Sequence, residues 1–260
     1  MSSNVISALE LDDRLLLKNF LLVTKDTYSD LNFFFGDFVS HYVKENHAII
    51  FVNLAQSNSH YTHLLAKSGV NIKIIRDRQK IVFVDAILEA GNLIESITDC
   101  ESTDFFNSLN KDCFDTNCLK PLYECIKNAA ERVCTTNPNG FIILIDEINL
   151  LMNLGSSLRA VQPFILQCHA LCSTISNIPG NLLVGSVFNE IDHENKKLVS
   201  YLSHLSDVKI QVEGLKTGFS KDTNGKITIK IKNKGLCTST EQKLFFKIGD
   251  KGAKLLPLGI

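Results

Sequence analysis

Short runs of apolar, largely β-branched residues alternate along the chain with longer segments in which apolar residues recur every three or four positions. A continuous apolar run is typical of a strand buried on both faces, so the runs predict a mainly parallel sheet. They lie at Asn19–Thr24, His47–Leu54, Lys80–Asp85, Gly140–Asp146 and Asn181–Val187. The periodic segments predict helices on both faces of that sheet. They lie at Leu31–Lys44, Tyr61–Lys67, Leu119–Cys134, Leu158–Ser176 and Glu194–His204.

Glycine and polar clusters mark the connections. Gly69, Gly140 and Gly180 each stand between a predicted helix and the next strand, where a glycine commonly caps the helix. The polar stretch Ser96–Asn117 is predicted to form an excursion or a mobile loop.

The pattern changes after Asp207, where three β-rich segments follow one another. They lie at Val208–Glu213, Lys226–Lys232 and Lys243–Ile248. Asn224-Gly225 is a typical hairpin turn, so we predict an antiparallel extension of the sheet. With 260 residues and 45% hydrophobic content, we predict one domain over residues 1–260, with 207–260 as its β-rich C-terminal extension. One domain with a small appendage is the alternative.

The composition indicates the cellular compartment and the state of the cysteines. No apolar run approaches the ~18 residues that a membrane span needs, and the N-terminus lacks a basic-then-apolar signal. We therefore expect the cytoplasm, with the nucleus as a second compartment, and no membrane partner. Eight irregularly spaced cysteines without a Cys-x-x-Cys pair fit reduced thiols. Cys168, His169 and Cys172 are the best metal candidates, but core packing accounts for them better, so we expect no metal and no cofactor.

Net charge is −1, yet it is unevenly placed. Residues 201–260 carry 11 Lys and 5 acidic residues, a balance of +6, which leaves −7 for the remainder. Such asymmetry can steer an acidic partner or RNA to one face, although a solvated lysine-rich strand surface explains it more simply.

The predicted strand at Phe141–Ile145 runs into Asp146-Glu147, the ending that nucleotide-hydrolysing α/β domains use for magnesium and water. The turn after the first strand should then be Gly-x-x-x-x-Gly-Lys-Ser/Thr. Instead it is Lys25–Asp30, which lacks glycine and contains two aspartates that would repel a triphosphate. Asp146 and Glu147 are thus nucleotide-site candidates, with turn capping as the favoured alternative.

Three basic groups are binding candidates. Arg76, Arg78 and Lys80 form a predicted basic loop that could reach a carboxylate or phosphate across an interface, or pair within the chain. Arg159 and the pair Lys196-Lys197 lie in or beside loops that leave the carboxyl ends of strands. Such loops can contact an RNA backbone, with ordinary solvated charges as the alternative.

Ser57 and His60 could suggest a nucleophile and its base. However, no Gly-x-Ser-x-Gly elbow is present, and helix capping explains these residues better.

Several stretches together resemble one family, the sixth subunit of the Elongator complex. They include Phe51–Tyr61, Lys67–Val70, Arg76–Arg78, Asn117–Leu122, Leu150–Gly155 and Val212–Asp222. The resemblance runs nearly end to end and depends on the order and spacing of these stretches.

The resemblance implies a RecA-like fold without nucleotide motifs and no catalytic residues in this chain. It also implies a hexameric ring built with two paralogous subunits, the fourth and fifth of Elongator. That ring binds tRNA and assists the catalytic Elongator subcomplex in modifying wobble uridine, and ring-level ATP hydrolysis has been associated with it. Two other classes stay open: a nucleotide-hydrolysing enzyme with an atypical phosphate site, and a purely structural adaptor.

Overall fold

The computed structural model describes residues 19–86, 119–136, 139–175, 178–215, 220, 222–232, 238–249 and 252–257. The predicted loop Ser96–Asn117 falls entirely in the gap between 86 and 119, outside these residues. The described strands form one sheet with the spatial order β3-β2-β4-β5-β1-β6-β7-β8-β9. These strands are β1 (Phe20–Lys25), β2 (Ala48–Asn53), β3 (Ile81–Asp85), β4 (Phe141–Ile145), β5 (Gly180–Val187), β6 (Val208–Gly214), β7 (Gly225–Lys232), β8 (Ser239–Gly249) and β9 (Gly252–Pro257).

The strands from β3 to β1 in this order run parallel to one another, as the apolar runs predict. The next strand, β6, also pairs parallel with β1, which corrects the prediction that its segment belongs to the antiparallel extension. Their residues alternate between two cores. Leu21 and Val23 of β1 belong to one apolar cluster, and Phe20 and Leu22 belong to the other. All four side chains are fully buried, because helices cover both faces of this part of the sheet.

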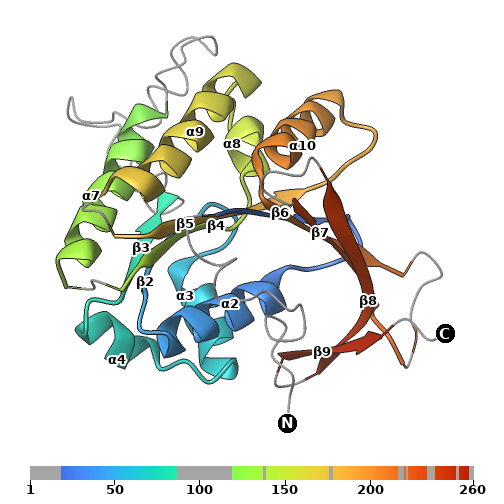
Figure 1. Ribbon diagram of the computed structural model, residues 1–260, viewed down its shortest axis with the longest axis horizontal. Helices are drawn as coiled ribbons and strands as arrows, with labels where there is room; N and C mark the ends of the chain where they lie inside the picture. Colours follow the sequence, from blue (N-terminus) through green and yellow to red (C-terminus); the bar gives the residue numbers. More distant parts are fainter. Residues whose placement is uncertain are drawn as a thin grey trace, which may run out of the picture.

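The helices divide between the two faces (Figure 1). One face carries α7, α8, α9 and α10, and the other carries α2, α3 and α4. The helices are α2 (Asn32–Lys44), α3 (Asn58–Lys67), α4 (Ile72–Asp77), α7 (Lys120–Thr136), α8 (Asn149–Asn153), α9 (Leu158–Thr174) and α10 (His193–Leu205). Among the helices of the described ranges, none is long and apolar enough to cross a membrane.

The C-terminal strands curl away from the parallel part and approach α2 (Figure 1). The β6–β7, β7–β8 and β8–β9 pairs are antiparallel, which confirms the predicted extension. Phe33 of α2 stacks on Phe246 of β8 with ring centroids 5.1 Å apart. The antiparallel strands therefore complete the apolar cluster that lies between the sheet and α2. The strand β9 was not predicted, because its six residues show no alternation of apolar and polar positions and end in a proline.

Two glycine predictions are corrected by packing. Gly225 is not a hairpin turn residue but the first residue of β7, paired with Gly214. A Cβ on Gly225 would lie 2.2 Å from the carbonyl oxygen of Glu213, so close strand approach explains this glycine. Gly180 is not a helix cap but the first residue of β5, where a Cβ would meet the Phe141 ring at 2.4 Å.

Gly69 does follow the C-cap of α3, and its φ of 80° is the left-handed conformation that ends helices. Gly140 also has a positive φ, 150°, and stands directly before β4.

Candidate functional site at the carboxyl edge of the sheet

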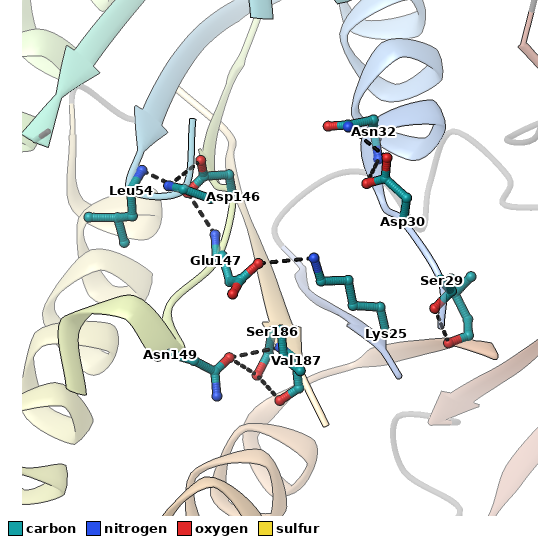
Figure 2. A network of polar contacts seen from close by, with 12 residues as sticks. Lys25, Ser29, Asp30, Asn32, Leu54, Asp146, Glu147, Asn149, Ser186 and Val187 are labelled. Atoms are coloured by element: carbon teal, nitrogen blue, oxygen red, sulfur yellow. Dashed lines mark hydrogen bonds and ion pairs between the residues drawn. The ribbon is translucent and has the colours of Figure 1, made fainter. Parts of the chain in front are cut away.

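Asp146 follows β4 at the carboxyl edge of the sheet, as predicted, and its side chain is buried. Its carboxylate accepts four hydrogen bonds. One oxygen accepts from the backbone N–H of Leu54 at 2.8 Å and of Glu147 at 2.7 Å. The other accepts from the N–H of Ala55 at 2.9 Å and from the hydroxyl of Tyr61 at 2.7 Å. Each oxygen thus has two donors, so the chain itself satisfies this carboxylate. Figure 2 shows two of these donors, the backbone N–H groups of Leu54 and Glu147.

These hydrogen bonds give Asp146 a structural task. Leu54 and Ala55 form the turn between β2 and α3, and β2 is the hydrogen-bonded neighbour of β4. Asp146 therefore ties that turn to the end of the next strand. Burial raises the pKa of the Asp146 carboxyl, and the four donated hydrogen bonds work against that rise because each favours the ionised form. Burial and the Asp146 charge raise the pKa of Tyr61 far above its ordinary value, so its hydroxyl stays protonated and donates.

Glu147, the second nucleotide-site candidate, pairs with Lys25 (Figure 2). The Lys25 ammonium lies 3.1 Å from the Glu147 carboxylate, and both side chains are about four-fifths buried. Lys25 ends β1, so it is the cation nearest in sequence to the place where a phosphate loop would begin. In this chain that cation pairs with an acid at the same edge of the sheet instead of facing solvent.

The turn after β1 packs onto β6. Asp26 accepts hydrogen bonds from the N–H of Tyr28 at 3.1 Å and of Gly214 at 3.0 Å. The Ser29 hydroxyl donates to the carbonyl of Val212 at 3.1 Å. The backbone N–H of Asp26 also donates to that carbonyl, at 3.2 Å. Two backbone amides of this turn, those of Asp26 and Tyr28, are thus already hydrogen-bonded within the chain and do not face a phosphate.

A carboxylate also stands at the N-terminus of α2, where a phosphate would be favoured by the helix dipole. Asp30 accepts from the N–H of Asn32 at 3.1 Å and from its side-chain amide at 2.7 Å (Figure 2). The turn after β1 therefore packs on β6 and places an acidic side chain where a phosphate loop would place a bound phosphate.

Other groups at this edge could not be found from sequence. Asn149 of α8 accepts hydrogen bonds from the Ser186 hydroxyl at 2.7 Å and from the Val187 N–H at 2.8 Å (Figure 2). A Cβ on Gly185 would lie only 1.9 Å from the carbonyl oxygen of Asp146, so β5 needs glycine at this point. Tyr61 carried no chemical motif either, because an aromatic residue on a helix predicts only packing.

The predicted RNA-contact residues lie near the starts of two helices, beside the loops that precede those helices. Arg159 is the second residue of α9, and Lys196 and Lys197 lie in α10. All three side chains are exposed. Helices that return from the carboxyl ends of β-strands begin at that edge, and α9 packs against α10, so the fold brings the three cations to the edge that carries Asp146. Their helix positions are ones where the dipole disfavours positive charge.

The predicted basic loop before β3 is instead a helix end. Arg76 lies in the last turn of α4, Arg78 follows that helix as its C-cap, and Lys80 donates to the side-chain oxygen of Asn46. The residues Ile72, Ile75 and the capping Asn71 make this short helix, which sequence analysis missed. These cations lie on the face opposite α7, near the β3 end of the sheet.

The remaining candidates have structural roles. Ser57 caps α3 by accepting from the N–H of His60 at 3.3 Å. Cys168 and Cys172 are buried in the apolar cluster under α9, and burial raises the pKa of both thiols. Over the described residues no group of three or more histidine, cysteine or acidic side chains could hold a metal ion.

The fold and this edge define the class of protein: a RecA-like α/β domain. The solved structure of a KaiC-like protein from Pyrococcus horikoshii has this fold. It superposes with a TM-score of 0.64 at 14% identity, covering 99% of this chain and 98% of that one.

Sequence comparison then identifies the family. Residues 4–250 match the family described as Elongation complex protein 6, and the chain belongs to that family. Elongator complex protein 6 of Homo sapiens is 30% identical over 246 residues, which cover 90% of this chain and 89% of the relative. The Xenopus laevis protein of that name is 31% identical over 221 residues, which cover 84% of this chain and 80% of the relative. The Drosophila melanogaster protein is 24% identical, with 100% and 98% covered.

Proposed function

We propose that this chain is a non-catalytic RecA-like subunit of the Elongator accessory ring, which assists tRNA wobble uridine modification through assembly and tRNA binding. One observation carries the non-catalytic part: the chain's own donors satisfy the Asp146 carboxylate, while Lys25 neutralises Glu147. A magnesium-nucleotide would have to displace these interactions. Family membership supports the assignment to Elongator.

Assembly with the paralogous subunits four and five, and through them with the catalytic Elongator subcomplex, is supported by exposed apolar side chains at the carboxyl edge. Tyr28 follows β1 and is 78% exposed, and Ile191 follows the adjacent β5 and is 90% exposed. The backbone of each is held by an aspartate or asparagine turn. Large apolar groups fixed in water favour a protein contact. A head-to-tail ring uses two different surfaces of each subunit, so this edge would meet a second surface on its neighbour.

The tRNA part of the proposal depends on pooled charge. A subunit with a net charge of −1 holds a polyanion poorly by itself. Arg159, Lys196 and Lys197 project from one edge, and the same edge repeated around a ring would add its fields in the pore. We place this work in the cytoplasm, with the nucleus as a second compartment.

Native mass spectrometry of the three coexpressed subunits tests assembly, and equal stoichiometry in one ring is expected. A chain that stays monomeric beside both partners would refute the ring assignment. The tRNA part is tested by salt titration of tRNA affinity with intact rings that carry Lys196→Glu with Lys197→Glu. Weaker binding and a flatter salt dependence are expected, alike for different tRNAs, because backbone contacts carry no sequence information.

The matched control is Lys44→Glu with Lys67→Glu, which changes the charge equally. These two exposed lysines end α2 and α3, at the opposite edge of the sheet. If the two double variants behave alike, or if the first changes nothing in rings shown to be intact, the chain is a structural adaptor without an RNA contact.

A further inference from the structure

The β3 end of the sheet holds a groove that the ring proposal does not use. Its volume is about 340 Å³. Ile81, Val82 and Phe83 of β3 line it, together with Arg76 from the end of α4 and Arg132 from α7. Because α4 and α7 cover opposite faces of the sheet (Figure 1), the groove follows the outer edge of β3 and has one arginine on each wall.

Both arginines are exposed and neither has a carboxylate partner in the part of the chain that the structure describes. The Arg76 guanidinium lies over the Phe83 ring, 5.5 Å from its centroid. A guanidinium held over an aromatic ring still has N–H donors to offer, and these can bind a carboxylate. Arg132 was not singled out from sequence, because one arginine on an exposed helix turn carries no pattern.

The floor of the groove is a strand edge. Within the described ranges β3 is the last strand of the sheet and pairs only with β2. Alternate residues of such a strand direct their N–H and C=O groups away from the sheet, where another strand can pair with them. Five residues at 3.3 Å each give a pairing length of about 16 Å, enough for a segment of about five residues.

We propose that this edge, termed here the β3 groove, binds an extended acidic polypeptide segment of a partner protein, which pairs with β3 as an added strand. Carboxylates of that segment bind Arg76 and Arg132, and its apolar side chains lie on Val82 and Phe83. A protein segment is favoured over RNA because the floor is a strand edge with apolar side chains, and among the described residues only two cations line the groove. A nucleic-acid groove of this length carries more positive charge and stacking aromatics.

The test uses a fluorescein-labelled ten-residue peptide of alternating glutamate and valine, with binding to the full chain followed by anisotropy. Wild-type protein should bind it, and Arg76→Glu with Arg132→Glu should weaken binding roughly tenfold or more, since two charge-assisted contacts become repulsive. The milder Arg76→Gln with Arg132→Gln should weaken it less, which guards against a folding defect in the charge-reversal variant. Lys73→Glu with Lys120→Glu is the matched control: both lysines are exposed on the same two helices and do not line the groove.

Two further peptides separate strand pairing from simple charge attraction. The alternating lysine and valine peptide should not bind. The acidic peptide methylated on alternate backbone nitrogens keeps its charge but loses its donors, and it too should not bind.

Absence of wild-type binding to the acidic peptide would overturn the proposal, as would full binding of the methylated peptide or equal effects of the arginine and lysine variants. A ten-residue oligouridylate that binds the same groove, lost in the same arginine variant, would reassign it to RNA. Self-association that the arginine variant abolishes in sedimentation would make a second copy the occupant. Either result replaces the proposed partner.

Discussion

Replacing Asp146 by alanine separates a structural carboxylate from a metal ligand. The substitution leaves four donors without their acceptor. Two of them, the Leu54 N–H and the Tyr61 hydroxyl, lie in buried hydrogen bonds, whereas the Ala55 and Glu147 amides are partly buried and can turn to water. Each buried donor without a partner costs about 1–3 kcal/mol, so Asp146→Ala should lower the free energy of unfolding by about 2–6 kcal/mol. Total stability of a domain is about 5–15 kcal/mol, so the loss is large.

The assay is urea unfolding of the full chain at pH 7, followed by circular dichroism, with Glu147→Ala as the matched control. Glu147 is the neighbouring acid, and its pair with Lys25 keeps about one fifth of each side chain open to water, so its removal should cost less, about 1–2 kcal/mol. Asp146→Asn should fall between the two, because the amide keeps one acceptor and the Tyr61 hydroxyl can rotate to accept from the new N–H.

A double-mutant cycle of Asp146→Ala with Tyr61→Phe measures the shared hydrogen bond, and a coupling of about 1.5–3 kcal/mol is expected for a bond to a charged acceptor. A buried carboxylate that waits for a metal lacks such donors, and its removal relieves an uncompensated charge. Stability of Asp146→Ala within about 0.5 kcal/mol of wild type, or above it, would therefore refute the structural role.

Two other predictions follow from packing and burial. Gly185→Ala should destabilise the domain by about 1–3 kcal/mol, because the new Cβ would lie 1.9 Å from the backbone carbonyl oxygen of Asp146 and one strand must shift. Thermal melting measures this loss, and an unchanged melting temperature would contradict the contact. Iodoacetamide at pH 8 should label the exposed Cys125 in the native protein but should react with Cys168 and Cys172 only after unfolding, since burial raises the pKa of both thiols. Peptide mapping by mass spectrometry measures the labelling, and rapid reaction of Cys168 or Cys172 in the native protein would contradict their burial.

The parallel part of the sheet could be predicted because its strands are buried on both faces. A strand such as Phe141–Ile145 then consists of apolar residues alone, and this pattern needs no knowledge of its partners. Short elements that depend on tertiary contacts could not be predicted. The helix α4 has six residues, too few for a clear period, and it forms because Ile72 and Ile75 pack into the core.

The sequence predicted that the site has no phosphate loop, but it did not predict which side chains contact one another there. The missing glycines after β1 indicate that no phosphate loop forms, since those amides need a special backbone. Nothing in the sequence, however, pairs Lys25 with Glu147 or joins Tyr61 to Asp146. These contacts span 85 residues or more and arise only when the sheet brings the ends of β1, β2 and β4 to one edge. For the same reason, the sequence did not show that Arg132 lines the groove at β3.

The central proposal is that this RecA-like domain does not bind a nucleotide at the carboxyl edge of its sheet, because the acidic groups there are already bound by its own donors and by Lys25. Calorimetric titration of the purified full chain with magnesium-ATP tests this most directly. The account predicts no measurable binding heat at millimolar nucleotide. A micromolar dissociation constant that Lys25→Ala or Glu147→Gln abolishes, in variants that remain folded, would show a working nucleotide site and contradict the claim.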